Sequence, residues 1–194
     1  MSLRISGKNI DIGDAFRAHA DGRLAEALQK YFDGGFAGHV MLERDGSQFR
    51  TECVIHLDTG MVLRAEGRAQ DAHQSLDKAV ERIENRLRRY KGKLKDHRAQ
   101  RRAEAEPAAS YVIAAPGEDS EAVVEDSPAI IAEETTRLET LTVGGAVMAM
   151  DLADASVFVF RHAGHGGINV VYRRADGHIG WIDPSLANKD NAKR

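Results

Sequence analysis

An acidic segment in the middle of the chain limits most strongly what this sequence can fold into. Residues 103–134 contain 9 Asp/Glu, no Lys/Arg and three of the four prolines. They show no helical or strand periodicity of useful length. Such a segment buries too little apolar surface to offset its chain entropy, and its like charges extend it. The sequence therefore predicts a disordered acidic linker with a separate domain on each side.

The linker also conceals how charge is distributed, because the whole chain carries a net charge of only −3. Residues 1–102 hold 20 Lys/Arg and 15 Asp/Glu, a net charge of +5, and the linker contributes −9. Residues 135–194 hold 7 Lys/Arg and 6 Asp/Glu, a net charge of +1. We therefore expect a basic domain over 1–102, a small domain over 135–185 and a short tail over 186–194.

Nothing in the sequence indicates a membrane or secreted protein. The longest apolar runs are far shorter than the roughly 20 residues needed to span a bilayer. The first residues, MSLRISGKNID, lack the apolar core of a signal peptide. The single cysteine, Cys53, cannot form an intramolecular disulfide and lies among apolar residues. We expect it to pack in the core of a cytoplasmic protein.

Hydrophobic periodicity predicts the order β-α-β-β-β-α for the first domain. Leu3 and Ile5 indicate a short first strand, and apolar residues from Phe16 to Tyr31 predict a helix with Asp14 as its N-cap. The glycines of DGGFAG (33–38) are expected to end that helix. Three strands should follow, separated by the turn sequences DGS and DTG, at about 39–44, 48–57 and 61–69.

A second helix is predicted from about Asp71. Its apolar residues recur at intervals of 4, 3, 4, 3 and 4, which confines them to a stripe about 80° wide; they are Leu76, Val80, Ile83, Leu87, Tyr90 and Leu94. An amphipathic helix buries such a stripe against a sheet. The first domain is therefore expected to be an α+β sheet with both helices on one face.

The second helix is strongly basic on both sides of its stripe. Residues 78–102 hold eleven Lys/Arg and three acidic residues, a net charge of +8. One flank consists of Lys78, Arg82, Arg86, Arg89 and Lys93, and the other of Arg88, Lys91 and Lys95. Like charges at i,i+4 are unfavourable unless an anion relieves them, so the pattern favours a nucleic-acid partner. Aromatic residues are only 6% and no helix-turn-helix or zinc-finger pattern occurs, so contacts to phosphates of structured RNA are expected.

The small domain over 135–185 is also predicted to be α+β. A short strand should precede a helix that Thr142 opens, with Val143, Ala146, Val147 and Met150 turned inward. The strands VFVFRH, GINVVYRR and HIGWIDP should follow. A domain of about fifty residues buries too little surface to be stable alone, and apolar strands exposed in it favour a partner. We therefore expect homodimerisation.

Two parts of the chain resemble a known family. The segment VFVFRHAGHGGINVVYRRADGHIGWIDP (157–184) is similar to the C-terminal domain of the long ribosome hibernation promoting factors, also called sigma-54 modulation proteins. RISGKNIDIGDAFRAHADGRLAEALQKYF (4–32) and DAHQSLDKAVERIENRLRRYKGKLKDHR (71–98) resemble the N-terminal domain. In that family the N-terminal domain lodges in the decoding channel of the small ribosomal subunit, on 16S rRNA. The C-terminal domains of two copies join two ribosomes into inactive dimers in stationary phase.

The resemblance implies two sets of functional residues. The residues facing rRNA would be Lys8, Arg17, Arg23, Arg82, Arg86, Arg89, Lys91 and Lys93. The dimer contacts would be Phe158, Phe160, Val170 and Tyr172. No cofactor and no small-molecule substrate is implied. The chain departs from the family pattern at Gly144-Gly145, where acidic residues are usual, and at Trp181, where leucine is usual; Trp181 would either enlarge the dimer contact or fill the core.

Other readings of the sequence are weaker. His162, His165 and His178 suggest a metal site, but the first two do not share a helix face and no Glu lies between them as in a zincin. Asp151 and Asp154 are expected in an exposed loop rather than as a catalytic pair. Arg173-Arg174 would contact rRNA or flank the dimer interface, and a partly structural role is favoured. The alternative function is a protein-binding regulator whose basic helix meets an acidic protein.

Overall fold

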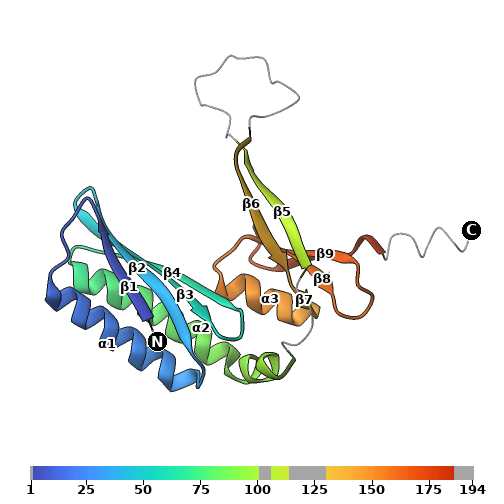
Figure 1. Ribbon diagram of the computed structural model, residues 1–194, viewed down its shortest axis with the longest axis horizontal. Helices are drawn as coiled ribbons and strands as arrows, with labels where there is room; N and C mark the ends of the chain where they lie inside the picture. The colour runs from blue at the N-terminus through green and yellow to red at the C-terminus, as the bar shows by residue number, and fades with distance from the viewer. Residues whose placement is uncertain (1, 101–105, 114–129, 186–194) are drawn as a thin grey trace, which may run out of the picture.

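The computed structural model describes residues 2–100, 106–113 and 130–185. Figure 1 shows a larger N-terminal unit, in which long helices lie against a sheet, and a smaller C-terminal unit with a shorter helix. A two-stranded hairpin projects away from both. The predicted tail over 186–194 lies outside the described residues.

The N-terminal unit has the predicted β-α-β-β-β-α order. Its elements are β1 (Ser2–Lys8), α1 (Asp14–Tyr31), β2 (Phe36–Asp45), β3 (Gln48–Leu57), β4 (Val62–Ala69) and α2 (Ala72–Gln100). The strands lie in the order β1-β2-β3-β4, so β1 and β4 are the edges. β1 runs parallel to β2, and the other two pairs are antiparallel hairpins.

Both helices cover the same face of this sheet, as predicted (Figure 1). On β3 the alternate residues Thr51, Cys53 and Ile55 are fully buried beneath them. Burial of Cys53 raises the pKa of its thiol to about 12, so the side chain packs as a neutral apolar group. The predicted stripe of α2 is buried along its length, with Tyr90 alone partly exposed.

The two hairpin turns form where their local sequence signals predict, but the ends of α1 do not. Gly46 and Gly60 have positive φ angles of 61° and 87°, which confirms both turns. The prediction of Asp14 as N-cap was wrong by one residue, because Gly13 holds the extended cap position and Asp14 begins the helix. Gly34 does not end α1 either, since Phe32 has already left the helix. Gly34 instead provides space: a Cβ there would lie 2.4 Å from the Phe32 ring.

The C-terminal unit is a second four-stranded sheet with one helix. Its elements are β7 (Thr140–Leu141), α3 (Val143–Leu152), β8 (Val157–His162), β9 (Ile168–Arg173) and β10 (Ile179–Ile182). The strands lie in the order β10-β9-β8-β7. The Thr142 hydroxyl accepts a hydrogen bond of 3.1 Å from the Gly145 amide, which confirms Thr142 as the residue that opens α3.

The C-terminal half of helix α3 is buried on all sides rather than on one, whereas Val143 and Val147, predicted to turn inward, are only partly buried. Ala146 and Met150 are buried as predicted, but Met148 is also buried although it lies about 200° round the axis from Ala146. One side of α3 packs on β8 and β9, and the other side packs on α2. Asp151, expected in an exposed loop, is instead a buried residue of this helix, because α2 covers it. Asp154 is exposed.

The two ends of the acidic segment differ from the linker prediction. Strands β5 (Glu106–Ile113) and β6 (Ile130–Leu138) pair antiparallel and form the projecting hairpin of Figure 1. Tyr111, Val112, Ile130 and Ile131 on it are exposed. Local periodicity did not reveal this pairing, because it depends on contacts between strands distant in sequence. The rest of the predicted linker, 103–105 and 114–129, lies outside the described residues.

Candidate nucleic-acid interface

The first basic flank of α2 lies along the open edge of β4. Lys78 Nζ donates to the carbonyl oxygen of Arg68 at 2.9 Å, and Arg82 Nη1 donates to that of Glu66 at 2.6 Å. Arg86 donates to the carbonyl oxygen of Arg64. Each of these side chains therefore satisfies one carbonyl group of an edge strand.

The spacing of these contacts follows from helix and strand geometry. Four residues of an α-helix rise about 6.0 Å, and two residues of a strand rise about 6.7 Å. Cations four residues apart on α2 therefore match carbonyl groups two residues apart on β4. These oxygens relieve part of the repulsion between like charges on this flank, a role that the charge pattern alone had suggested for an external anion.

Two cations of the same flank also bind the C-terminal unit. Arg89 Nη1 lies 2.5 Å from Asp151 Oδ2, and Arg86 forms an ion pair with Asp154. Asp151 Oδ1 accepts a further hydrogen bond of 2.8 Å from Arg173. Burial alone would raise the pKa of Asp151, but the hydrogen bond from Arg173, the charge of Arg89 and a hydrogen bond from Tyr90 outweigh it. The pKa of Asp151 is therefore held below its ordinary value.

The second flank of α2 carries the cations that are most available to an external anion. On this flank Arg88 and Lys91 are exposed, as is Lys93 at the end of the first flank, and Arg88 has an internal contact at 3.0 Å with Asn85 on the same helix. Lys91 extends over the Tyr31 ring, 5.8 Å from its centroid, and Lys30 of α1 lies 5.3 Å from the same centroid. Lys30 was absent from the predicted set. The sequence signal that could have indicated Lys30 is its position in the last turn of α1, next to Tyr31.

The remaining predicted RNA-facing residues contact the protein itself. Lys8 forms an ion pair of 3.1 Å with Glu43 and remains largely exposed. Arg17 Nη1 donates to the carbonyl oxygen of Ile5 at 2.9 Å. These two side chains lie near β1, away from the basic flanks of α2, and the structure does not bring them together with Lys91 or Lys93.

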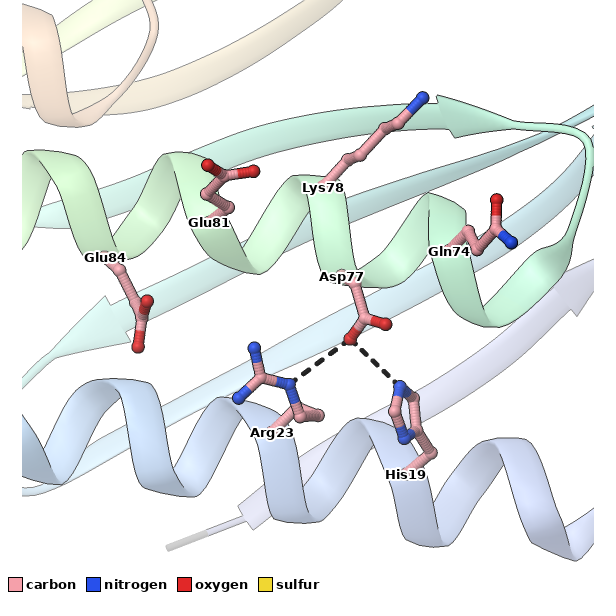
Figure 2. Close-up of a pocket in the computed structure, with 7 residues that line it drawn as sticks. All are labelled: His19, Arg23, Gln74, Asp77, Lys78, Glu81 and Glu84. Atoms are coloured by element: carbon pink, nitrogen blue, oxygen red, sulfur yellow. Dashed lines mark hydrogen bonds and ion pairs between the residues drawn. The ribbon is translucent and has the colours of Figure 1, made fainter.

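Arg23 lies in a shallow pocket between α1 and α2, shown in Figure 2. The pocket has a volume of about 460 Å³. Arg23 Nε lies 3.2 Å from Asp77 Oδ1, and His19 Nε2 lies 3.0 Å from the same oxygen. Glu81 and Glu84 of α2 also line the pocket. The carboxylates around Arg23 make this groove a poor site for a phosphate.

The four predicted dimer residues fall on opposite faces of the C-terminal sheet. Phe160 is fully buried on the face that α3 covers, and Phe158 is partly buried on the same face. Val170 and Tyr172 lie on the other face. That open face also exposes apolar residues that were absent from the predicted set: Val157, Val159, Ile168 and Ile182. On this face the Tyr172 ring lies over Gly180, and a Cβ on Gly180 would be 2.2 Å from the ring.

Trp181 and the arginine pair have structural contacts. Trp181 Nε1 donates to Asn169 Oδ1 at 2.7 Å on the helix side of the sheet, and Trp181 remains 46% exposed. It therefore belongs neither to the open face nor to the buried core. Arg173 binds Asp151 and Arg174 binds Asp176 at 2.8 Å each, which agrees with a structural role for both.

The histidines of the C-terminal unit are not arranged around a common point. The rings of His162 and His165 stack with centroids 4.2 Å apart, and His165 Nε2 lies 3.1 Å from Asp183. Among the described residues, no group of three or more His, Cys, Asp or Glu side chains is placed to hold a metal ion. Within the same ranges, no helix is long and apolar enough to cross a membrane.

Similar proteins match both units in the same order. Residues 3–95 match the family described as Sigma 54 modulation protein / S30EA ribosomal protein, and residues 125–180 match the model for its C terminus. The "Ribosome hibernation promotion factor" of Bradyrhizobium diazoefficiens is 49% identical, over 98% of this chain and 98% of that protein. The protein of the same name from Rhizobium meliloti is 47% identical over 94% of this chain and 97% of its own length.

More distant proteins are also similar. The "Ribosome hibernation promotion factor" of Lactococcus lactis is 30% identical over 94% of this chain and 98% of that protein. Among solved structures, the Thermus thermophilus Protein Y N-terminal domain is 31% identical, with a TM-score of 0.43, over 46% of this chain and 99% of that chain. The near full-length matches to the hibernation promotion factors lead to one assignment. This chain belongs to the ribosome hibernation promotion factors, in the long form that has both the N-terminal and the C-terminal domain.

Proposed function

We propose that this chain binds the small ribosomal subunit in its decoding channel, against 16S rRNA, and represses translation by occupying the space of mRNA and tRNA. The observation that carries this proposal is a group of exposed cations in the C-terminal half of α2, to which Lys30 adds a further cation: Arg88 and Lys91 of the second flank and Lys93 at the end of the first. A continuous set of cations on one helix suits the phosphate backbone of a folded RNA. The names of the relatives support the ribosome as the partner.

In this proposal the chain acts by binding, needs no cofactor or small-molecule substrate, and works in the cytoplasm, where the ribosomes are. Recognition through phosphates rather than bases agrees with the few aromatic residues, 6% of the chain. Such recognition depends strongly on salt, because each phosphate contact releases condensed counterions.

Two copies would pair through the open face of the C-terminal sheet and so join two ribosomes into an inactive dimer. Val157, Val159 and Ile182 are 55%, 43% and 50% exposed there. A group of large apolar side chains on the open side of a four-stranded sheet is typical of a protein-protein contact. Because α3 covers the opposite face, the contact needs no change in the C-terminal core.

Sucrose-gradient sedimentation of purified bacterial ribosomes, with and without the protein, tests both parts. We expect the protein in the ribosomal fractions at low salt, its release at high salt, and a peak of ribosome dimers. The variant Val159→Glu should remain in the ribosomal fractions without producing dimers, because it places a charge on the open face only. Protein that stays in the supernatant at low salt would contradict ribosome binding and favour a regulator that binds another protein.

A further inference from the structure

The C-terminal helix α3 runs along the basic flank of α2 in the opposite direction. At the start of α3, Lys93 Nζ lies 3.7 Å from the position that a Cβ on Gly144 would take. Further along, Asp151 pairs with Arg89, and just beyond the helix Asp154 pairs with Arg86. The contact therefore follows three of the cations that were predicted to face rRNA.

This contact is more than a surface ion pair. The buried apolar residues of the two units form one continuous cluster, which includes Leu94 of α2 and Ala146 of α3. A helix that is apolar all round needs cover on every side, and α2 supplies it on the side away from the C-terminal sheet. Docking of the C-terminal unit on α2 is therefore stabilised by burial as well as by charge.

The carboxylates in this contact bind the same guanidinium groups that a phosphate would bind. A guanidinium presents the same pair of N–H donors to a carboxylate and to a phosphate. The Arg86 side chain is only 13% exposed, because it is held by the Arg64 carbonyl and by Asp154. Arg89 is 58% exposed but has one nitrogen bonded to Asp151.

We propose that this docked arrangement masks the basic flank: Asp151 and Asp154 compete with ribosomal RNA for Arg89 and Arg86, so that docking of the C-terminal unit and full engagement of RNA exclude each other. The inference rests on the proposed function, because RNA is the competitor. The measured affinity for RNA is then the intrinsic affinity reduced by the fraction of molecules that are undocked. By linkage, RNA binding releases the C-terminal unit to the same extent that docking weakens RNA binding.

Release would not disturb pairing between two copies. The open face with Val159 and Tyr172 lies on the opposite side of the sheet from α3. Masking and pairing therefore use different surfaces, and a variant in one can be measured without changing the other.

The variant Asp154→Asn tests the competition. Asp154 has a positive φ of 54°, which asparagine adopts readily, so the backbone should be unchanged while the charge facing Arg86 is removed. The matched control is Asp176→Asn, which removes one negative charge from the same unit but faces Arg174 rather than α2. Both variants change the net charge of the chain equally, so a general electrostatic effect on RNA binding cancels between them.

Two measurements are made on the full chain. Energy transfer between dyes on cysteines introduced at Ala18 of α1 and Ala175 of the C-terminal unit, both exposed, reports docking. Cys53 is buried and does not take a dye. Affinity for purified small ribosomal subunits is measured at one fixed low salt concentration.

We expect Asp154→Asn to show less energy transfer and to bind subunits about two- to fivefold more tightly than wild type and Asp176→Asn, the range expected for one partly exposed ion pair. Energy transfer in the wild type should fall when subunits are added. Equal affinities for both variants, or energy transfer that subunits do not change, would overturn the masking and leave the proposed function intact. If the wild type and both variants fail to bind subunits at low salt, the proposed function fails and the competition fails with it.

Discussion

Arg82 Nη1 donates a hydrogen bond of 2.6 Å to the carbonyl oxygen of Glu66, on the open edge of the N-terminal sheet. Lys78 and Arg86 do the same for the carbonyl groups on either side. Exposed strand edges pair with other chains and cause aggregation unless they are covered or charged. The basic flank of α2 thus protects β4 as well as carrying charge.

Replacing Arg82 with methionine should therefore increase self-association through β4. The substitution keeps an unbranched side chain but removes the donor, and we expect a loss of about 0.5–1.5 kcal/mol in the free energy of unfolding. Light scattering at increasing protein concentration measures the association. Arg88→Met is the control, because Arg88 is exposed on the same helix and donates to Asn85 of that helix rather than to β4; equal scattering by the two variants would contradict edge protection.

The triple substitution of Arg88, Lys91 and Lys93 by glutamine should weaken binding to small ribosomal subunits and reduce its salt dependence. Each lost phosphate contact lowers the slope of log affinity against log salt by about 0.7–0.9, so loss of three contacts should lower it by about 2 to 3. Titrations at several salt concentrations measure it. The control replaces Arg44, Arg64 and Arg68, which lie on β2 and β4, with the same change in charge. A similar fall in both triple variants would mean that net charge, rather than these three cations, drives binding.

Phe160→Ala should destabilise the C-terminal unit, because it leaves a cavity under α3. Phe160 is fully buried, and such changes cost about 3–5 kcal/mol. Val159→Ala, at a neighbouring position that is 43% exposed, should cost less than about 1 kcal/mol. Thermal unfolding at concentrations where the chain is monomeric compares them, and equal losses would show that the two faces of the sheet are misassigned.

The ion pairs of Asp151 should make the C-terminal unit sensitive to acid. Its neighbours are Arg89 and Tyr90 on α2 and Arg173 on β9, and its pKa in the folded chain is below the ordinary value of 3.8. A lowered pKa contributes stability that is complete above the ordinary value and is lost as pH falls through the folded value. Stability measured from pH 6 down to about pH 2 should therefore fall less steeply for Asp151→Asn than for wild type. Identical profiles would exclude a contribution from this carboxyl group.

Elements with a clear local period were predictable from the sequence. The stripe of α2 has a period close to 3.6 residues, and the hairpin turns around Gly46 and Gly60 have short-range signals, so both were confirmed. The faces of β8 were not predictable, because VFVFRH is apolar on both sides. Only the position of α3 determines that Phe160 is buried while Val159 is open.

Contacts between distant elements were also beyond the sequence pattern. The basic residues of α2 looked free because nothing local shows that β4 presents carbonyl groups at a matching spacing. Asp151 looked like a loop residue because its burial depends on α2, which is far away in the sequence. The basic surface could be located from the sequence, but the part of it already bound by the protein could not.

The burial of Cys53 determines how its thiol reacts in the folded chain. The thiolate is the form that reacts with peroxide and alkylating agents, and with a pKa of about 12 almost none of it exists at neutral pH. Since the chain has one cysteine, no other thiol can form a covalent adduct or cross-link two copies. The cysteine of the native protein should therefore stay reduced and unmodified in an oxidising medium, and only unfolding would make this thiol reactive.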